Sequence, residues 1–210
     1  MNFRQNFELK KLYKKQNNLI FYFSDSKKTS NLNQVFKKLP KKTNFIFRNY
    51  DSSKLNREIL LQNFILSNRT HHYQIYVGKN FNLAHKYCCY GLHHSDFDFY
   101  KSKFSAYISC YKARKIQISL SLSIHSVLSA KIAKQILPNI IFLSPIFPST
   151  SHLNEKPLGF YAFLKFRKLL HSKYNFTNII ALGGINLQNL SKLNIVNVKG
   201  FGAIDFFNNL

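Results

Sequence analysis

Two residues whose types suit acid–base chemistry lie close together after one apolar run of the sequence. Ser123 and His125 follow the β-forming run at residues 118–122. A histidine exchanges its proton near neutral pH, so His125 could act as a general acid or base. A hydrogen-bonded structural histidine is the alternative, but the flanking Ser123 and Ser126 place His125 in a polar loop, which favours the functional interpretation.

Residue types that bind anions follow several other apolar runs. They are an arginine, a lysine, two serines, a histidine and two glycines: Arg48, Lys79, Ser149, Ser151, His152, Gly183 and Gly184. Glycines let backbone N–H groups approach a phosphate, and the N-terminus of a following helix adds a favourable dipole. We therefore predict that these residues bind phosphate. For the two glycines, an ordinary tight strand-to-helix turn is the alternative.

A third group of polar residues has the composition of a metal site. His93 and His94 are adjacent on a predicted strand, so their side chains point to opposite faces and cannot both bind one ion without distortion. The carboxylates of Asp96 and Asp98 suit Mg²⁺ better, because this ion prefers oxygen ligands and is often shared with substrate phosphates. A solvated loop is the alternative for this segment.

The order of apolar runs and helical patterns predicts how these residues are positioned. Runs of β-forming residues alternate with segments whose apolar residues recur near a 3.6-residue period, which gives eight strands alternating with helices. This pattern predicts an α/β protein, a single-domain (β/α)8 TIM barrel over residues 18–210 after a basic N-terminal lead-in at residues 1–17. A doubly wound open sheet is the alternative, but eight regular units without a crossover break favour closure. A barrel gathers the loops after its strands at one face, where we expect the polar residues to meet.

The boundaries of the elements follow from the apolar runs and the residues that interrupt them. The predicted strands are residues 18–24, 43–47, 73–77, 90–93, 118–122, 140–143, 178–182 and 198–201. The predicted helices are residues 33–39, 54–66, 81–87, 97–113, 127–136, 158–170, 187–193 and 204–208. In the second of these helices, one buried stripe is expected, made of Leu55, Ile59, Leu60 and Phe64.

The composition narrows the classes of protein and partner. There are 31 Lys and Arg residues against 8 Asp and Glu residues, a formal net charge of +23. Because the lysines are scattered through every segment, we interpret most of them as solvated surface charge. A small phosphate-rich ligand is the next interpretation, and nucleic acid is not expected as a partner.

Membrane, disulfide-rich and structural-zinc classes do not fit the sequence. No apolar run reaches transmembrane length, and residues 1–16 contain no signal-peptide apolar region, so we expect a soluble, cytoplasmic protein with no membrane partner. The three cysteines are odd in number and two are adjacent, which argues against a disulfide framework, and no Cys-x-x-Cys pair indicates zinc. A homo-oligomer is compatible with the sequence.

Four motifs occur in order along the second half of the chain. They are Ser123-Ile124-His125-Ser126, Ser144-Pro145-Ile146-Phe147-Pro148-Ser149-Thr150-Ser151-His152, Pro157-Leu158-Gly159 and Ala181-Leu182-Gly183-Gly184-Ile185. Together they resemble the thiamine phosphate synthase and thiazole tautomerase superfamily, whose pattern is S-T-H-S, G-P-V/I-F-P-T-x-S/T-K, P-L-G and A-I/L-G-G-I. Earlier in the chain, Phe47-Arg48-Asn49-Tyr50-Asp51 is similar to its L-R-E-K-D, and Gly91-Leu92-His93 is similar to its G-V-H.

The resemblance implies the condensation of a hydroxymethylpyrimidine pyrophosphate with a thiazole phosphate, which gives thiamine phosphate and pyrophosphate. Such a transferase needs cations and hydrogen-bond donors on the leaving pyrophosphate rather than a nucleophilic residue. Carried over by position, Arg48 would bind the pyrophosphate and Ser123 would donate a hydrogen bond to the reacting ligand. Ser149 and Ser151 would hold phosphate oxygens, and the amides near Gly184 would bind the thiazole phosphate.

The chain departs from the family pattern at several positions. Tyr50 replaces the lysine of R-E-K, and His152 replaces the lysine that closes the phosphate loop. Gly78-Lys79 stands where the family has Asn-Asp, which removes one Mg²⁺ carboxylate and leaves Asp98 as the remaining candidate ligand. Lys79 could replace the metal as a fixed charge. Asp205 is an anion where the family has a serine that helps to hold phosphate.

Two other functions fit the same residues. These departures resemble a divergent alphaproteobacterial branch, with F-R-H-Y at the arginine and P-T-x-S-H in the loop, whose activity need not equal that of the parent family. A thiazole tautomerase would use His125 as its proton carrier, but the loop Pro148-Ser149-Thr150-Ser151 resembles the synthases more closely. A non-catalytic barrel that binds a phosphate ligand, or one associated with nucleic acid, is the third alternative.

Overall fold

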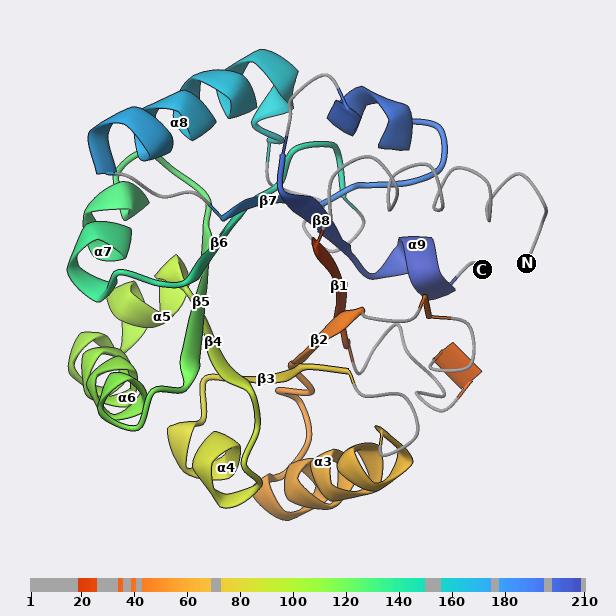
Figure 1. Cartoon of the computed structure of the whole chain (residues 1–210), viewed down its shortest axis with the longest axis vertical. Coiled ribbons are helices and arrows are strands. Elements are labelled where there is room, and N and C mark those ends of the chain that lie inside the picture. Colours follow the sequence, from red (N-terminus) through yellow and green to blue (C-terminus); the bar gives the residue numbers. More distant parts are fainter. Residues whose placement is uncertain are drawn as a thin grey trace.

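Parallel strands form the centre of the molecule and pair in sequence order. The structure is a computed structural model that describes residues 19–25, 34–35, 39–40, 43–68, 73–149, 156–174, 178–194 and 198–208. The strands are β1 (Leu19–Phe23), β2 (Asn44–Phe47), β3 (Ile75–Gly78), β4 (Gly91–Ser95), β5 (Ser119–Ile124), β6 (Ile140–Leu143), β7 (Ile179–Leu182) and β8 (Gly200–Ala203). Each strand is hydrogen-bonded to the next, and β8 pairs in parallel with β1, so the sheet closes into a barrel (Figure 1).

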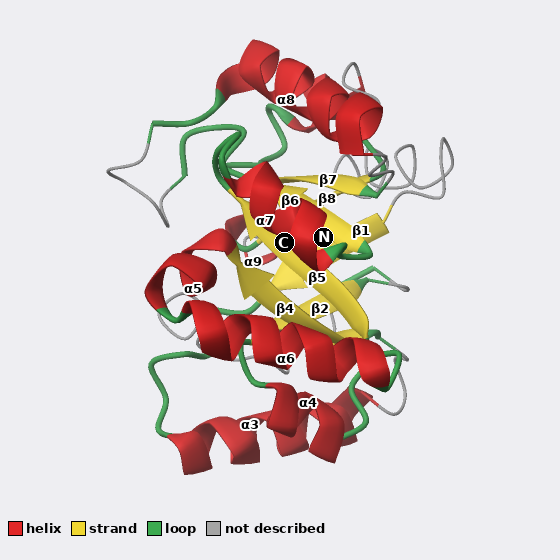
Figure 2. Cartoon of the chain, turned by 90° about the vertical axis from the view of Figure 1, so that its left-hand side faces the viewer, coloured by secondary structure: helices red, strands yellow, loops and turns green. Residues whose placement is uncertain are grey.

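Helices connect the strands and surround the barrel (Figures 1 and 2). In the described ranges they are α3 (Lys54–Asn68), α4 (Phe81–Lys86), α5 (Asp96–Lys101), α6 (Lys103–Lys115), α7 (Ser129–Ile136), α8 (Gly159–Tyr174), α9 (Asp205–Asn208) and the 3₁₀-helix η1 (Leu190–Asn194). This arrangement confirms the predicted (β/α)8 TIM barrel. The predicted lead-in at residues 1–17 and most of the predicted helix at residues 33–39 lie outside the described residues.

Two apolar layers hold the barrel together, because successive residues of a strand point to opposite faces. In β1, Phe21 and Phe23 belong to the interior layer, whereas Ile20 and Tyr22 belong to the layer between the strands and the helices. The other buried members of the interior layer are Ile46, Tyr76, Ile140, Phe142 and Ile180. Among the described helices, none is long and apolar enough to cross a bilayer.

Aromatic rings fill the interior, where branched aliphatic residues are usual in this fold. The Phe142 ring meets Phe21 edge-on with a centroid distance of 4.8 Å, and it meets Phe23 at 5.0 Å. A glycine makes room for this packing, because a Cβ atom at Gly202 would lie 2.7 Å from the Phe23 ring. The Phe23 ring therefore fits inside the barrel because position 202 is a glycine.

The predictions differ from the structure most clearly at the end of β5 and at residues 97–113. Ser123 was expected in a loop, but the β5 ladder continues past the apolar run, pairing Ser123 with Ser95 of β4 and with Phe142 of β6. The single helix expected at residues 97–113 is instead the pair α5 and α6. They are separated at Ser102, whose backbone angles of φ −143° and ψ 57° are not helical.

The stripe predicted for α3 was also wrong in part. Leu55 and Ile59 are 67% and 45% exposed, whereas the fully buried residues are Leu61 and Phe64. Apolar residues occur on several sides of this helix, so the 3.6-residue period alone does not select one face. The selected face is the one whose Phe64 ring packs on Phe45 of β2, at a centroid distance of 4.2 Å.

Candidate functional site

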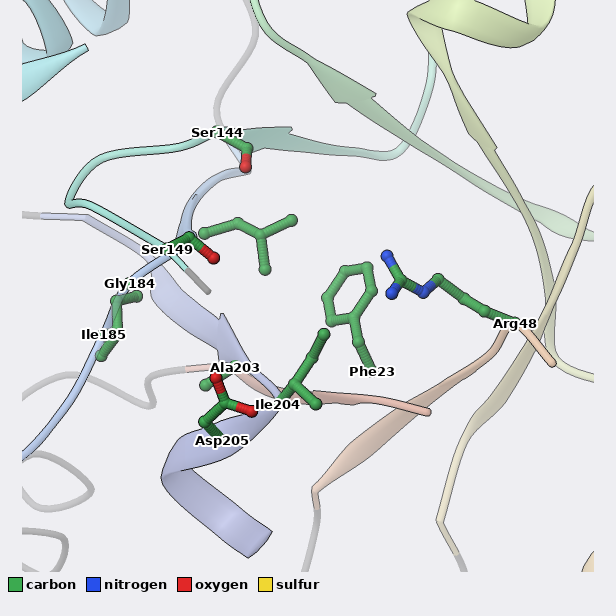
Figure 3. A pocket seen from close by; sticks show the side chains of 11 residues that line it. Phe23, Arg48, Ser144, Ser149, Gly184, Ile185, Ala203, Ile204 and Asp205 are labelled. Carbon is green, nitrogen blue, oxygen red and sulfur yellow. The ribbon is translucent and has the colours of Figure 1, made fainter. Parts of the chain in front are cut away.

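A pocket with a cavity volume of about 60 Å³ opens at the carboxyl ends of the strands (Figure 3). Its lining comes from β1, β7 and β8 and from the segments after β2, β6, β7 and β8: Phe23, Arg48, Ser144, Ser149, Leu182, Gly183, Gly184, Ile185, Ala203, Ile204 and Asp205. The structure thus brings together Arg48, Ser149, Gly183 and Gly184, as expected from the barrel, and their binding roles stay predictions.

Arg48 is held in place by the end of the neighbouring strand β1. Its guanidinium forms an ion pair with Asp25 at 3.0 Å and donates through Nε to the Ser24 carbonyl at 3.2 Å. The backbone N–H of Arg48 donates to the Ser24 hydroxyl, which in turn donates to Asn49. The guanidinium carbon lies 5.7 Å from the centroid of the Phe23 ring. The arginine is therefore oriented before a ligand arrives.

The two glycines after β7 allow two loops to pack backbone against backbone. Gly183 and Gly184 have φ angles of +92° and +66°, which favour glycine. A Cβ atom at Gly184 would lie 2.6 Å from the carbonyl oxygen of Phe147. Phe147 donates its N–H to the Gly183 carbonyl at 3.2 Å. The glycines are thus needed to hold the loop that carries Ser149, whatever their amides bind.

The pocket has opposite charges on its two sides. Figure 3 shows Arg48 reaching in from the end of β2, with Ser149, Gly184 and Asp205 on the opposite side. Asp205 begins the short helix α9, directly after β8. The pocket wall therefore includes a carboxylate at the position where the family pattern has a hydroxyl.

His93 and Ser123 form a polar contact in the barrel interior. His93 Nδ1 lies 3.0 Å from the Ser121 hydroxyl, and Nε2 lies 3.4 Å from the Ser123 hydroxyl. Burial lowers the pKa of His93 to about 3, and the positive charge of Arg48 acts in the same direction. His93 is therefore neutral at physiological pH, and Ser123 lies against an uncharged ring.

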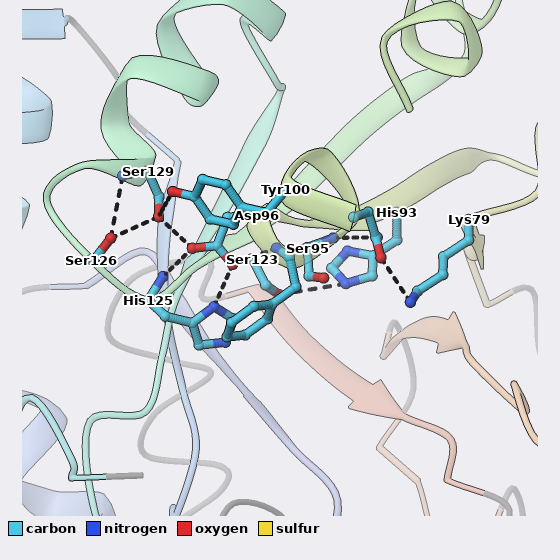
Figure 4. Close-up of polar contacts among 11 residues, drawn as sticks. Lys79, His93, Ser95, Asp96, Tyr100, Ser123, His125, Ser126 and Ser129 are labelled. Carbon is cyan, nitrogen blue, oxygen red and sulfur yellow. Dashed lines mark hydrogen bonds and ion pairs between the residues drawn. The ribbon is translucent and has the colours of Figure 1, made fainter. Parts of the chain in front are cut away.

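A buried carboxylate holds His125. Nδ1 of His125 lies 2.6 Å from Asp96 Oδ1, and its backbone N–H donates to Asp96 Oδ2 at 3.0 Å (Figure 4). The Ser129 hydroxyl also donates to Asp96. Although burial raises the pKa of Asp96, the hydrogen bonds from His125 and Ser129 outweigh it and lower the pKa. Because the ionised carboxylate can only accept, His125 carries its proton on Nδ1.

Asp98 faces a different set of groups. Its Oδ1 forms an ion pair with the Lys79 ammonium at 2.7 Å. Its Oδ2 accepts from the Ser95 N–H at 2.9 Å and lies 3.2 Å from His94 Nδ1. Burial raises the pKa of Asp98, but the hydrogen bonds from His94 and Lys79 outweigh it and hold the pKa well below its usual range. Both oxygens of the carboxylate are thus occupied.

Comparison with known protein families identifies the family of this chain. A sequence profile described as thiamine monophosphate synthase matches residues 21–205. The chain belongs to the thiamine monophosphate synthase family. This confirms the resemblance drawn from the motifs.

Solved structures share the barrel of this thiamine monophosphate synthase family member. A thiamine phosphate pyrophosphorylase from Pyrococcus furiosus is 12% identical with a TM-score of 0.66, over 90% of this chain and 87% of that chain. One from Bacteroides thetaiotaomicron is 18% identical with a TM-score of 0.53, over 89% and 82%. A structure described as native KDPGal is 10% identical with a TM-score of 0.54, over 89% and 82%. At such identities these likenesses show the fold alone. A search of curated protein sequences finds no match.

The other predicted site residues of this family member lie in three places. Ser123 is buried in β5, and His125 lies in the loop after it. Lys79 follows β3 and is not part of the pocket lining. Ser151 and His152, both predicted to bind phosphate, lie outside the described residues.

The residues around Asp98 do not form a magnesium site of the usual kind. Mg²⁺ takes an octahedral set of oxygen ligands, including carboxylates. Here Asp98 Oδ1 faces an ammonium, while Oδ2 caps α5 at Ser95. Asp96, the other carboxylate predicted to suit Mg²⁺, faces His125 instead. Within the described ranges, no group of three or more His, Cys, Asp or Glu residues could hold a metal ion.

Proposed function

We propose that this protein is a transferase of the thiamine phosphate synthase type. It would condense a hydroxymethylpyrimidine pyrophosphate with a thiazole phosphate and release thiamine phosphate and pyrophosphate. The observation that carries the proposal is the pocket in which a pre-oriented Arg48 faces Ser149 and the turn at Gly183 and Gly184. Membership of the thiamine monophosphate synthase family supports the choice of substrates.

Arg48 would act on the leaving group. When the bond between the pyrimidine methylene carbon and the pyrophosphate oxygen breaks, its electron pair moves to that oxygen. A guanidinium offers several donors to such an oxyanion, and one that is already oriented needs little rearrangement as the charge develops. The contacts of Arg48 with Asp25 and Ser24 supply this orientation.

The thiazole nitrogen would then capture the methylene carbon with its lone pair, forming the new C–N bond. No protein nucleophile is needed for this step. The neutral state of His93 suits it, because a protonated imidazole next to Ser123 would place a further positive charge beside a cationic centre. Ser123 would donate a hydrogen bond to the reacting ligand, while the Ser149 hydroxyl and the amides near Gly184 would hold the thiazole phosphate.

Genetic complementation tests the proposal. The gene should restore growth without thiamine to a strain that lacks its own thiamine phosphate synthase. Arg48→Met should abolish rescue, because it removes the charge while keeping much of the side-chain volume. Lys86→Met is the matched control, since Lys86 is a 64% exposed cation that pairs with Glu58 away from the pocket. Failure of a well-expressed wild-type chain to rescue growth would count against the proposal.

A second candidate, a thiazole tautomerase, is favoured by the contact between Asp96 and His125. A carboxylate that fixes the tautomer and orientation of an imidazole is the arrangement used for proton transfer. If this activity is present, the protein should exchange a carbon-bound proton of a thiazole phosphate for deuterium in D₂O. His125→Asn should abolish the exchange, and Asp96→Asn should slow it about 10²-fold or more. Exchange that persists in both variants would exclude this role for His125.

A further inference from the structure

The Lys79 ammonium is held between a carboxylate and an aromatic ring. Its Nζ lies 2.7 Å from Asp98 Oδ1 and 4.4 Å from the centroid of the Tyr50 ring. An aromatic face and a carboxylate together attract an ammonium from two directions. The Lys79 side chain is still 44% exposed, so it is accessible from solvent.

The backbone around Lys79 is also held on several sides. Lys79 has a left-handed φ of +62°, and its N–H donates to the His93 carbonyl at 2.8 Å. Arg57 donates to the Gly78 carbonyl at 2.6 Å, and its guanidinium carbon lies 5.3 Å from the centroid of the Tyr50 ring. Glycine at position 78 leaves room for the Tyr50 ring, because a Cβ atom there would collide with it. The turn, the ring and the ammonium thus form one packed unit.

Lys79 and Arg48 follow neighbouring strands on the same side of the barrel. They follow the adjacent strands β3 and β2, which pair in parallel. Burial is the main cause of the low pKa of His93, and the positive charges of Arg48 and Lys79 both add to it. Both cations therefore act on the buried histidine that contacts Ser123, Arg48 from the pocket wall and Lys79 from outside the pocket lining.

We propose that Lys79 is a fixed cation that, with Arg48, binds the pyrophosphate group without a divalent metal ion. The ammonium already neutralises the carboxylate that a metal would need, and it can turn its remaining N–H donors to a phosphate oxygen. This inference rests on the proposed function for its substrate, but it concerns the binding of pyrophosphate and is measured without turnover.

Calorimetry with inorganic pyrophosphate in EDTA tests the binding directly. The wild-type chain should bind pyrophosphate, and Mg²⁺ should tighten the binding by no more than about twofold. Lys79→Asn should weaken binding at least tenfold, because it removes the ammonium while asparagine tolerates the left-handed backbone. Lys86→Asn is the matched surface control and should bind as the wild type does. Binding that requires Mg²⁺, or equal affinity in the wild type and Lys79→Asn, would overturn the proposal.

A charge reversal at the same position supplies a second test. Lys79→Asp differs from Lys79→Asn by one charged group, and it would place a second carboxylate beside Asp98. Electron paramagnetic resonance should then detect Mn²⁺ bound to Lys79→Asp but not to Lys79→Asn or the wild type. Tight Mn²⁺ binding by the wild type would contradict the proposal. Circular dichroism melting curves check that each variant folds.

These outcomes are separate from those of the proposed function. If the wild type binds pyrophosphate in EDTA through Lys79 but makes no thiamine phosphate, the proposed function fails and the role of Lys79 stands. If thiamine phosphate forms only when Mg²⁺ is present and pyrophosphate binding shows the same requirement, the role of Lys79 fails and the proposed function stands.

Discussion

At the scale of single residues, the charged groups of the barrel mouth are held by neighbours from adjacent strands. Arg48 after β2 is fixed by Ser24 and Asp25 after β1, and His125 after β5 is fixed by Asp96 after β4. In each pair, the contact shields the arginine or the histidine from solvent and limits the rotation of its side chain. Such orientation lowers the entropic cost of binding and is expected of a site that stabilises developing charge.

His93 should make the stability of the protein depend on pH. Its folded pKa of about 3 lies below the unfolded value of about 6.5, so between these values the unfolded chain binds more protons. Stability contributed by the neutral histidine is complete above about pH 6.5 and is lost as the pH falls. Between pH 7.5 and pH 5, we expect the wild type to lose about 2 kcal/mol more unfolding free energy than His93→Gln.

Urea unfolding at the two pH values gives this difference, because the other titrating groups are common to both proteins. A nuclear magnetic resonance titration of the wild type supplies an independent measurement that needs no variant. A His93 ring that gains its proton near pH 6.5, or equal pH dependence in the two proteins, would contradict the assignment.

Four residues of the pocket lining could be predicted from the sequence, whereas the partners that hold the polar residues could not. Motif order located Arg48, Ser149 and the two glycines after β7. The contact of Asp96 with His125 joins residues 29 positions apart and depends on the register of β4 against β5, which no local pattern specifies. Asp96 and Asp98 both lie in the first turn of α5, where side chains two residues apart do not face each other.

At the scale of elements, the loops after β6 and β7 act as one support for the pocket. Gly184 combines a φ of +66° with close packing on the backbone of Phe147. Gly159, which begins α8, has a similar φ of +72°, but a Cβ atom there would meet nothing within 4 Å. Alanine substitutions at the two glycines therefore distinguish the free-energy cost of backbone strain from that of a steric collision.

We expect Gly159→Ala to lower the unfolding free energy by about 1 kcal/mol, which is the cost of the left-handed conformation alone. Gly184→Ala should cost about 3 kcal/mol or more, because the added methyl group also forces the two loops apart. Chemical denaturation of both variants measures the difference. Equal costs would show that the loops do not depend on this contact.

The strands could be predicted closely, and the helices less closely, for a physical reason. A strand buried on both faces is a continuous apolar run, so its position is visible directly. The face that a helix buries depends on its neighbours, as α3 shows by exposing Leu55 and burying Leu61. The break between α5 and α6 depends on the backbone at Ser102, and no glycine or proline marks it.

At the scale of the whole molecule, the barrel explains why dispersed residues form one site. Alternating strands and helices with right-handed connections leave few topologies, so closure could be predicted from the pattern alone. Closure then places β8 beside β1, which brings Asp205 to the pocket that contains Phe23. The formal charge of +23 is much larger than the few cations at the barrel mouth, so net charge does not locate the site.

The most direct measurement of the central claim is product formation by the purified wild-type chain. The protein is incubated with the hydroxymethylpyrimidine pyrophosphate and the thiazole phosphate, and both products are quantified. The proposed function predicts that thiamine phosphate and pyrophosphate appear in equal amounts over many turnovers. Binding of both substrates without any thiamine phosphate would contradict it and identify the barrel as a binding protein instead.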